Sequence, residues 1–335
     1  MDRRNAIVGF ADFVTALVVA AVSIWPFPVA SQRAAIPVVG YLSAGSPNER
    51  ALLLEAFRQG LKQGGYIDGQ DLALEYRWAE GHADRLPRLA TELVNRKVAV
   101  IFATGGTIPA LAAKSATSTI PIVFTGGSDP VKLGLVESLA RPGKNLTGVV
   151  NIAASLNAKR VQILRELLPR ASSIGYLVNP NFPNMKSLIA EVQAASDATG
   201  TKLHVLNAST EAEIDAAFVS LKQSRANALL VATDPLFFSR RDQIVSLAAR
   251  HGVPASYPFR EYADAGGLMS YGPDLADSAR QAGVYTTRIL KGARPGELPV
   301  IQSDKFELVV NLKTAKKLGI TVPRDFLSRV DEVIQ

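Results

Sequence analysis

The sequence predicts an α/β protein of two lobes, each built from a parallel sheet flanked by helices and joined to the other by a hinge. Short apolar runs that end in glycine or small polar residues alternate with amphipathic segments along the 335-residue chain. This alternation is typical of parallel sheets covered by helices on both faces. It starts again near Val150, and a chain of this length can bury two separate cores. Two Rossmann-like lobes are therefore expected.

The first series of elements begins near Ile36 with the apolar run "PVVGYLS", which is expected to form a buried strand. The helix that follows carries Leu53, Phe57 and Leu61 on one face and ends at a pair of glycines. Helices are expected at 84–97 and 107–117. Further strands complete this series, at 71–78, 98–106, 120–127 and 145–150.

The second series begins with the amphipathic segment "NAKRVQILRELLP" and has strands expected at 173–180, 228–235 and 266–273. A long helix is expected at about 275–291, and Pro273 is a candidate for a return crossing between lobes. We therefore expect an N-terminal lobe at 36–150, completed by about 274–300, and a C-terminal lobe at 151–273. The pattern leaves the lobe of residues 301–335 open.

The first 31 residues have the pattern of a secretory signal peptide. Arg3 and Arg4 precede the apolar run "FVTALVVAAVSIW", and Val29 and Ser31 stand where small residues precede a cleavage point. The run is shorter than the roughly 20 residues of a spanning helix, which favours cleavage over an anchor. The pattern leaves open whether export follows the general or the twin-arginine route. We expect the mature protein in the periplasm.

Composition excludes several classes of site. The chain has no cysteine, which rules out disulfides, thiolate metal ligands and cysteine nucleophiles. Its formal net charge is +7, but the basic residues are scattered without a dense run. Nucleic acid is therefore not an expected partner, and a basic but ordinary surface is the preferred interpretation.

Polar residues follow the predicted strands at the same point in both halves. The strand ends read "YLSAGS", "IFATGGT" and "VFTGGSDP", then "YLVNPN", "LLVATDP" and "ASYPF". In open α/β sheets, ligands bind beyond the carboxyl ends of the strands, and helix N-termini there offer N–H groups to anions. The alternative is that these residues only cap helices and form turns. Their recurrence at three strand ends in each half favours a binding site.

The chemical type of each side chain suggests a role in that site. Asp129 or Asp234 would receive an ammonium group, although both precede prolines and could simply cap turns. Asn179 would reach in from the second lobe. An apolar or aromatic group would lie against Phe237, Tyr257 and Tyr271, unless the tyrosines belong to the core. Hydroxyl groups suit a carboxylate or a polar head group, and the candidates are Ser43, Thr104, Thr107, Thr125 and Ser128.

Signatures of catalysis and of cofactor binding are missing from the sequence. Tyr41 stands where a G-x-S-x-G nucleophile elbow around Ser43 needs glycine, and no phosphate-binding glycine motif is present. The three histidines, His82, His204 and His251, have no metal-ligand spacing. An enzyme built on Asp129 or Asp234 would lack a recognisable partner base. We expect no metal, no cofactor and no catalysis.

Four segments resemble the ABC transporter substrate-binding proteins of the ABC_sub_bind family. They read "IFATGGTIPALAAK", "PIVFTGGSDPVKLGLVESLARPGKNLTGV", "LLVATDPLF" and "VVNLKTAKKLGI". The resemblance covers nearly all of the chain from about Ile36, and the segment from Asp129 through "ARPGKNLTG" is its most specific part. It implies the type I periplasmic-binding fold and a receptor that closes around a solute. Some members of the family bind tryptophan or related aromatic amino acids.

The resemblance also implies partners. A receptor of this kind delivers its ligand to a membrane permease, while a separate subunit hydrolyses ATP. An amino acid or related carboxylate is the leading ligand class, and a monomer or weak dimer is expected. Two alternatives remain open at this point: an exported α/β enzyme acting on a small metabolite, and a ligand-binding partner of a sensor kinase.

Overall fold

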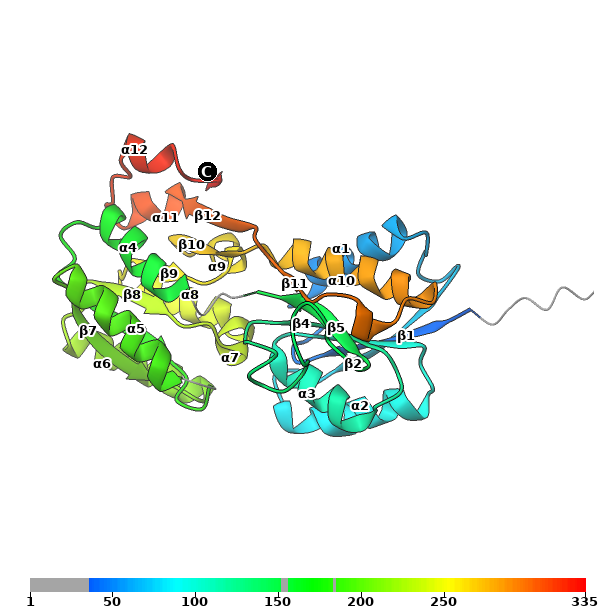
Figure 1. Ribbon diagram of the computed structural model, residues 1–335. Helices are drawn as coiled ribbons and strands as arrows, with labels where there is room; N and C mark the ends of the chain where they lie inside the picture. Colours follow the sequence, from blue (N-terminus) through cyan, green and yellow to red (C-terminus); the bar gives the residue numbers. More distant parts are fainter. Residues whose placement is uncertain (1–35, 152–155, 183–184) are drawn as a thin grey trace, which may run out of the picture. The chain divides into compact units, whose positions relative to one another are not determined.

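The computed structural model describes residues 36–151, 156–182 and 185–335, which form two sheets flanked by helices (Figure 1). The predicted signal peptide, residues 1–31, lies outside the described residues. Within the described part of the chain, no helix is both long and apolar enough to cross a bilayer. The predicted class, two α/β lobes with parallel sheets, is confirmed.

The first lobe is built on a six-stranded sheet with the order β11-β5-β4-β3-β1-β2. Every strand pair in it is parallel. Most of its strands come from the first 150 residues, and the last joins from far along the chain. They are β1 (Val38–Ser43), β2 (Ala73–Trp78), β3 (Val100–Thr104), β4 (Ile122–Gly126), β5 (Leu146–Val150) and β11 (Ile301–Gln302).

The second lobe is built on a seven-stranded sheet with the order β13-β12-β10-β9-β8-β6-β7. Its pairs are parallel except for β10 with β12, which is antiparallel. The first five strands of this lobe repeat the order of the first lobe, so both sheets have a switch point beside their first strand. The strands are β6 (Ser173–Val178), β7 (Lys202–Asn207), β8 (Ala228–Val231), β9 (Ala255–Tyr257), β10 (Met269–Pro273), β12 (Phe306–Asn311) and β13 (Glu332–Ile334).

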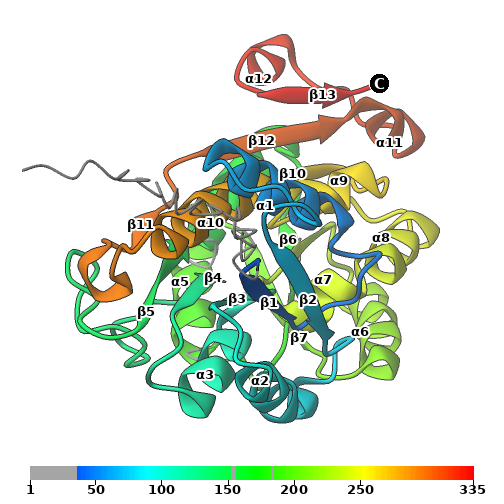
Figure 2. The same cartoon turned by 90° about the vertical axis from the view of Figure 1, so that its right-hand side faces the viewer.

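Helices cover both faces of the first sheet because its strands are apolar on both sides. Tyr41 and Phe102 belong to the cluster under α1 (Ala51–Gln63) and α10 (Leu275–Leu290). Leu42 and Ile101, one residue away in each strand, belong to the cluster under α2 (Leu86–Asn95) and α3 (Thr107–Ala116). Side chains of a strand alternate between faces, so this division follows from period two. Figure 2 shows the two helix pairs on opposite sides of the sheet.

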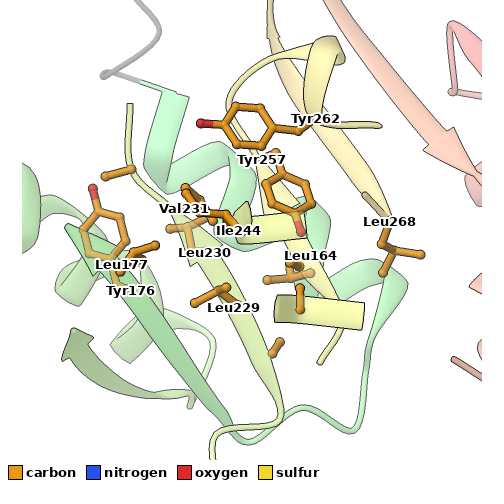
Figure 3. Packing of buried hydrophobic residues seen from close by; sticks show 14 of the residues in the cluster. Leu164, Tyr176, Leu177, Leu229, Leu230, Val231, Ile244, Tyr257, Tyr262 and Leu268 are labelled. Carbon is orange, nitrogen blue, oxygen red and sulfur yellow. The ribbon is translucent and has the colours of Figure 1, made fainter. Parts of the chain in front are cut away.

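One continuous core fills the second lobe. Figure 3 shows Leu229, Leu230 and Val231 of β8 among buried side chains of the surrounding helices, such as Leu164 and Ile244. The helices of this lobe are α4 (Asn157–Leu167), α5 (Met185–Ala198), α6 (Glu211–Gln223), α7 (Pro235–Ser239), α8 (Arg241–Arg250), α9 (Arg260–Asp264), α11 (Leu312–Lys317) and α12 (Arg324–Leu327).

The chain passes between the sheets at three places. It leaves β5 for α4, returns from β10 to α10, and leaves again from β11 to β12. In Figure 1, α10, in orange, lies beside the blue helix α1. Long-range pairing thus divides residues 301–335 between the sheets: β11 joins the first, and β12 and β13 join the second. The domain boundaries themselves stay a prediction.

Helices α1 and α10 approach each other through glycines. A Cβ on Gly60 would overlap the carbonyl oxygen of Arg280, and one on Gly283 would overlap the carbonyl oxygen of Phe57. Glycine in a helix interior costs about 1 kcal/mol relative to alanine. The close backbone packing at this crossing is the physical reason for glycine at both positions.

We expect Gly60→Ala to destabilise the protein by about 1–3 kcal/mol, because the new methyl group must force α1 away from α10. Urea unfolding followed by circular dichroism measures this change. Leu52→Ala is the control, since Leu52 lies on the same helix and is 70% exposed. A Gly60→Ala protein as stable as the wild type would contradict the close approach.

Candidate ligand-binding cleft

The carboxyl ends of both sheets line a cavity of about 350 Å³. From the first lobe come residues that end or follow β3, β4 and β5, and from the second lobe residues that follow β6, β8 and β9. This is the position expected for ligands in open α/β sheets. The volume falls at the small end of the range for ligand pockets, about 300–1,000 Å³. It therefore suits a metabolite of amino-acid size.

Six of the residues predicted from the sequence line this cavity. They are Thr104, Thr107, Thr125, Ser128, Asn179 and Asp234. The structure brings them together from both lobes. The other five lie outside the lining, and they are Ser43, Asp129, Phe237, Tyr257 and Tyr271.

Local hydrogen bonds account for two of the five residues outside the lining. Ser43 is fully buried, and its hydroxyl accepts a hydrogen bond from the Gly45 N–H at 3.2 Å. Asp129 accepts hydrogen bonds from Val131 N–H at 2.9 Å and Lys132 N–H at 3.2 Å, and its side chain is 47% exposed. Both side chains stabilise turns, as expected if strand-end residues only form turns and cap helices.

The aromatic residues predicted from the sequence lie outside the lining of the cavity. Phe237 and Tyr257 are buried in the core, where the Tyr257 ring stacks on Tyr262 with centroids 4.9 Å apart (Figure 3). Tyr271 lies in β10 with its ring 6.4 Å from that of Phe306. The aromatic residues in the lining are instead Phe182, Phe238 and Phe259.

Two of these rings follow a predicted residue closely in the chain. Phe238 comes directly after Phe237, and Phe259 ends the quoted segment "ASYPF" that contains Tyr257. Successive helical residues point about 100° apart, so the choice within the Phe pair depends on how α7 is rotated. No sequence signal on its own reports that rotation.

A pair of buried threonines forms part of the first lobe's wall. Thr104 ends β3 and Thr125 lies in the neighbouring strand β4, and their hydroxyl oxygens are 2.8 Å apart. Both side chains are less than 10% exposed. Two hydroxyl groups carry two protons, and their mutual hydrogen bond uses one. The second proton can be donated to a ligand.

The N-terminus of α3 opens into the same wall. Gly105 and Gly106 have φ of 89° and 113°, a left-handed region that side chains disfavour. None of the described side chains caps this helix, and its first turn carries no acid. Its free N–H groups and the helix dipole favour a negative charge at Thr107. This end of the cavity can therefore receive an anion.

Asp234 supplies negative charge from the second lobe. It is 4% exposed, and its Oδ1 accepts hydrogen bonds from Leu236 N–H at 2.8 Å and Phe237 N–H at 3.4 Å. Burial raises the pKa of Asp234, although these backbone bonds and the Asn179 side chain act in the opposite direction. A cationic ligand group would relieve the desolvation of its carboxylate.

Arg50 is a functional candidate that sequence reasoning missed. It stands at the start of α1, lines the cavity and is only 5% exposed. In the sequence it follows "SPNE" at the start of a helix, a context typical of a solvated arginine. Arg50 and Asp234 are the two charged residues in the described lining.

Comparison with known proteins agrees with this fold. Residues 46–334 match the family of ABC transporter substrate binding proteins. The tyrosine-binding protein of Clostridioides difficile (strain R20291) is 28% identical over 266 residues, which span 79% of this chain and 76% of that protein.

Solved structures share the two-lobed architecture. A conserved domain protein from Vibrio cholerae has 29% identity and a TM-score of 0.80, covering 89% of this chain and 99% of its own. An ABC domain from Streptococcus pneumoniae in complex with L-Trp has 26% identity and a TM-score of 0.79, with the same coverage. A ligand-free, open substrate-binding protein from Clostridium difficile has 25% identity and a TM-score of 0.65, covering 90% of this chain and 100% of its own.

More distant structures bear on the fold alone. A putative LacI-family repressor from Corynebacterium glutamicum has 14% identity and a TM-score of 0.56, covering 82% of this chain and 97% of its own. It shares the two α/β lobes of the type I periplasmic-binding fold. The match over residues 46–334 decides the family. The chain belongs to the ABC transporter substrate-binding proteins, a family of transport binding proteins rather than enzymes.

Proposed function

We propose that this chain is a periplasmic receptor that captures an amino acid in the cavity and delivers it to the permease of an ABC importer. One observation carries the proposal. Asp234, 4% exposed, lines the same cavity as the uncapped N-terminus of α3. A buried acid and an anion-favouring helix terminus in one small cavity suit a zwitterion better than a neutral solute.

Each part of an amino acid has a partner in the lining. The ammonium group would donate hydrogen bonds to Asp234, and the carboxylate would accept them from the first turn of α3 and the hydroxyl pair of Thr104 and Thr125. The side chain would lie against the aromatic rings, which are Phe182, Phe238 and Phe259.

Two comparisons support an aromatic amino acid as the first ligand to test. One relative is a tyrosine-binding protein, and one similar structure is a complex with L-Trp. The chain also has a higher TM-score with that complex, 0.79, than with the ligand-free, open structure, 0.65, at nearly equal identity and coverage. This difference supports the interpretation that the lobes are arranged more as in the L-Trp complex than as in the ligand-free, open structure.

Closure would couple ligand capture to delivery. A ligand that contacts Asp234 in one lobe and α3 in the other favours the arrangement in which both sets of contacts form. Hinge closure around a ligand is a standard motion of two-lobed receptors. The closed lobes would then dock on a permease. The sequence carries no phosphate-binding glycine motif, so ATP hydrolysis would belong to a separate subunit.

Asp234→Asn tests the ammonium partner. Asparagine caps helices as well as aspartate does, so the unliganded melting temperature should stay close to that of the wild type. Loss of the carboxylate should weaken binding of L-tyrosine or L-tryptophan by about 10-fold to 100-fold, as expected for a hydrogen bond to a charged group. Calorimetric titration measures the affinities.

Asp129→Asn is the matched control, because Asp129 has the same side chain but lies outside the cavity. It should bind the amino acid as the wild type does. Unchanged affinity in Asp234→Asn would remove Asp234 from the site. A wild-type protein that no amino acid stabilises against heating would overturn the ligand class.

Affinity for the amino acid should rise with pH across the raised pKa of Asp234, because the ammonium group binds the ionised carboxylate. The stability of the protein without ligand should change in the opposite direction. A pKa that is higher in the folded than in the unfolded state stabilises the protein at low pH, and this contribution is lost as pH rises through the folded-state pKa. Titrations from pH 4 upward should show both trends in the wild type and neither in Asp234→Asn. A flat affinity profile in the wild type argues against a charge pair.

A further inference from the structure

We propose that Arg50 binds a carboxylate of the ligand, so that the receptor selects solutes that carry a carboxylate over counterparts that lack it. This inference rests on the proposed function and adds a residue that determines specificity. Arg50 comes from the first lobe, at the start of α1. Its side chain lines the cavity and is 95% buried, since only 5% is exposed.

Among the described residues, the guanidinium of Arg50 has no hydrogen-bonding or ionic partner. Its Nε is buried without an acceptor. Burying an arginine without hydrogen-bond acceptors is costly, and such side chains are nearly always paired. An arginine in this condition on the wall of a cavity indicates a partner that arrives with the ligand.

The neighbours of Arg50 offset only part of that cost. Its guanidinium carbon lies 4.0 Å from the centroid of the Phe238 ring, a cation–π contact with the second lobe. Such a contact is weaker than the hydration that a buried cation gives up. Helix α1 gives no compensation either, because a cation at a helix N-terminus opposes the helix dipole.

Nearby acids do not act as firm counter-ions. Glu261 contributes a favourable charge, but burial raises the pKa of Glu261 to about 7. Its Oε2 is buried without a hydrogen-bond partner, and it forms no ion pair with Arg50 among the described residues. The other charged neighbours of Arg50 are Glu49 and Arg241. Protein groups therefore balance the Arg50 charge only in part in this arrangement of the lobes.

Arg50 also lies beside the other anion-favouring feature of the wall. A smaller cavity of about 40 Å³ is lined by Arg50 together with Gly105 and Ile108, which flank the start of α3. A carboxylate at this place could accept hydrogen bonds from the guanidinium fork and from the free N–H groups of α3. The guanidinium of Arg50 and the N-terminus of α3 both favour a negatively charged group.

If Arg50 had only a structural role, a different result would be expected. Because Arg50 belongs to the first lobe and Phe238 to the second, their contact could only hold the lobes closed. Loss of this contact between the lobes would lower the affinity for every ligand by the same factor. A carboxylate partner would be lost only for ligands that carry a carboxylate.

The experiment compares acids with their amides by calorimetric titration. The probes are L-tyrosine with L-tyrosinamide, L-tryptophan with L-tryptophanamide and benzoate with benzamide, together with uncharged sugars. We expect the wild type to prefer each bound acid to its amide at least 10-fold. Arg50→Gln should weaken the acids by about 10-fold to 100-fold and leave the amides nearly unchanged.

Arg241→Gln is the matched control. Arg241 lies over the same Phe238 ring at 5.3 Å but does not line the cavity, so the preference for acids should persist. The unliganded Arg50→Gln protein should melt close to the wild type, because the substitution removes no hydrogen bond or ion pair with a described residue.

Three results would overturn the proposal: equal binding of acids and amides by the wild type, an equal loss for both in Arg50→Gln, or binding of uncharged sugars alone. The last result would leave a solute receptor in place while removing the role of Arg50. Binding of no probe at all would contradict both the anion site and the proposed ligand class.

Discussion

The cavity depends on one constraint: two parallel sheets with the same strand order present their carboxyl ends to a common space. Parallel strands end at one edge of a sheet, and the switch point beside the first strand leaves a crevice there. Thr104 and Thr125 stand at that edge in one lobe, and Asn179 and Asp234 in the other. Thr104 and Thr125 lie in strands, Asn179 directly follows β6, and Asp234 caps α7, so a ligand meets groups that need little reordering.

Within this space, the two charged side chains have opposite signs and come from opposite lobes. Arg50 and Asp234 are each about 95% buried, and the hydration that each has given up is incompletely replaced by protein contacts. Charges interact more strongly away from water. A ligand with both an ammonium group and a carboxylate would relieve both side chains at once. Binding and closure are then favoured by the same contacts.

The return of the chain at α10 stiffens the first lobe. Gly60 and Gly283 let the backbones of α1 and α10 touch, which buries the apolar face of each helix against the sheet. We expect a lobe completed in this way to move as a unit. On the proposed function, a hinge between the lobes would then close without deforming either wall of the cavity.

The two α/β lobes and six residues of the polar lining could be predicted from the sequence. Apolar runs reveal buried strands, and the residue that ends a parallel strand lies at the ligand-binding edge whatever the details of packing. Thr104, Thr125 and Asp234 could be predicted for this reason. The resemblance of four segments to a known family led to the same fold.

Long-range packing determines which of two neighbouring residues lines the cavity and which arginine at a helix start becomes buried. Phe238 rather than Phe237 reaches the cavity because the rotation of α7 is set by packing. The local sequence around Arg50 is typical of a solvated arginine, but Phe238 of the second lobe covers its guanidinium. The placement of β11 and β12 in different sheets likewise depends on pairing with distant strands. Such contacts join residues far apart in the chain, so they cannot be predicted from local periodicity.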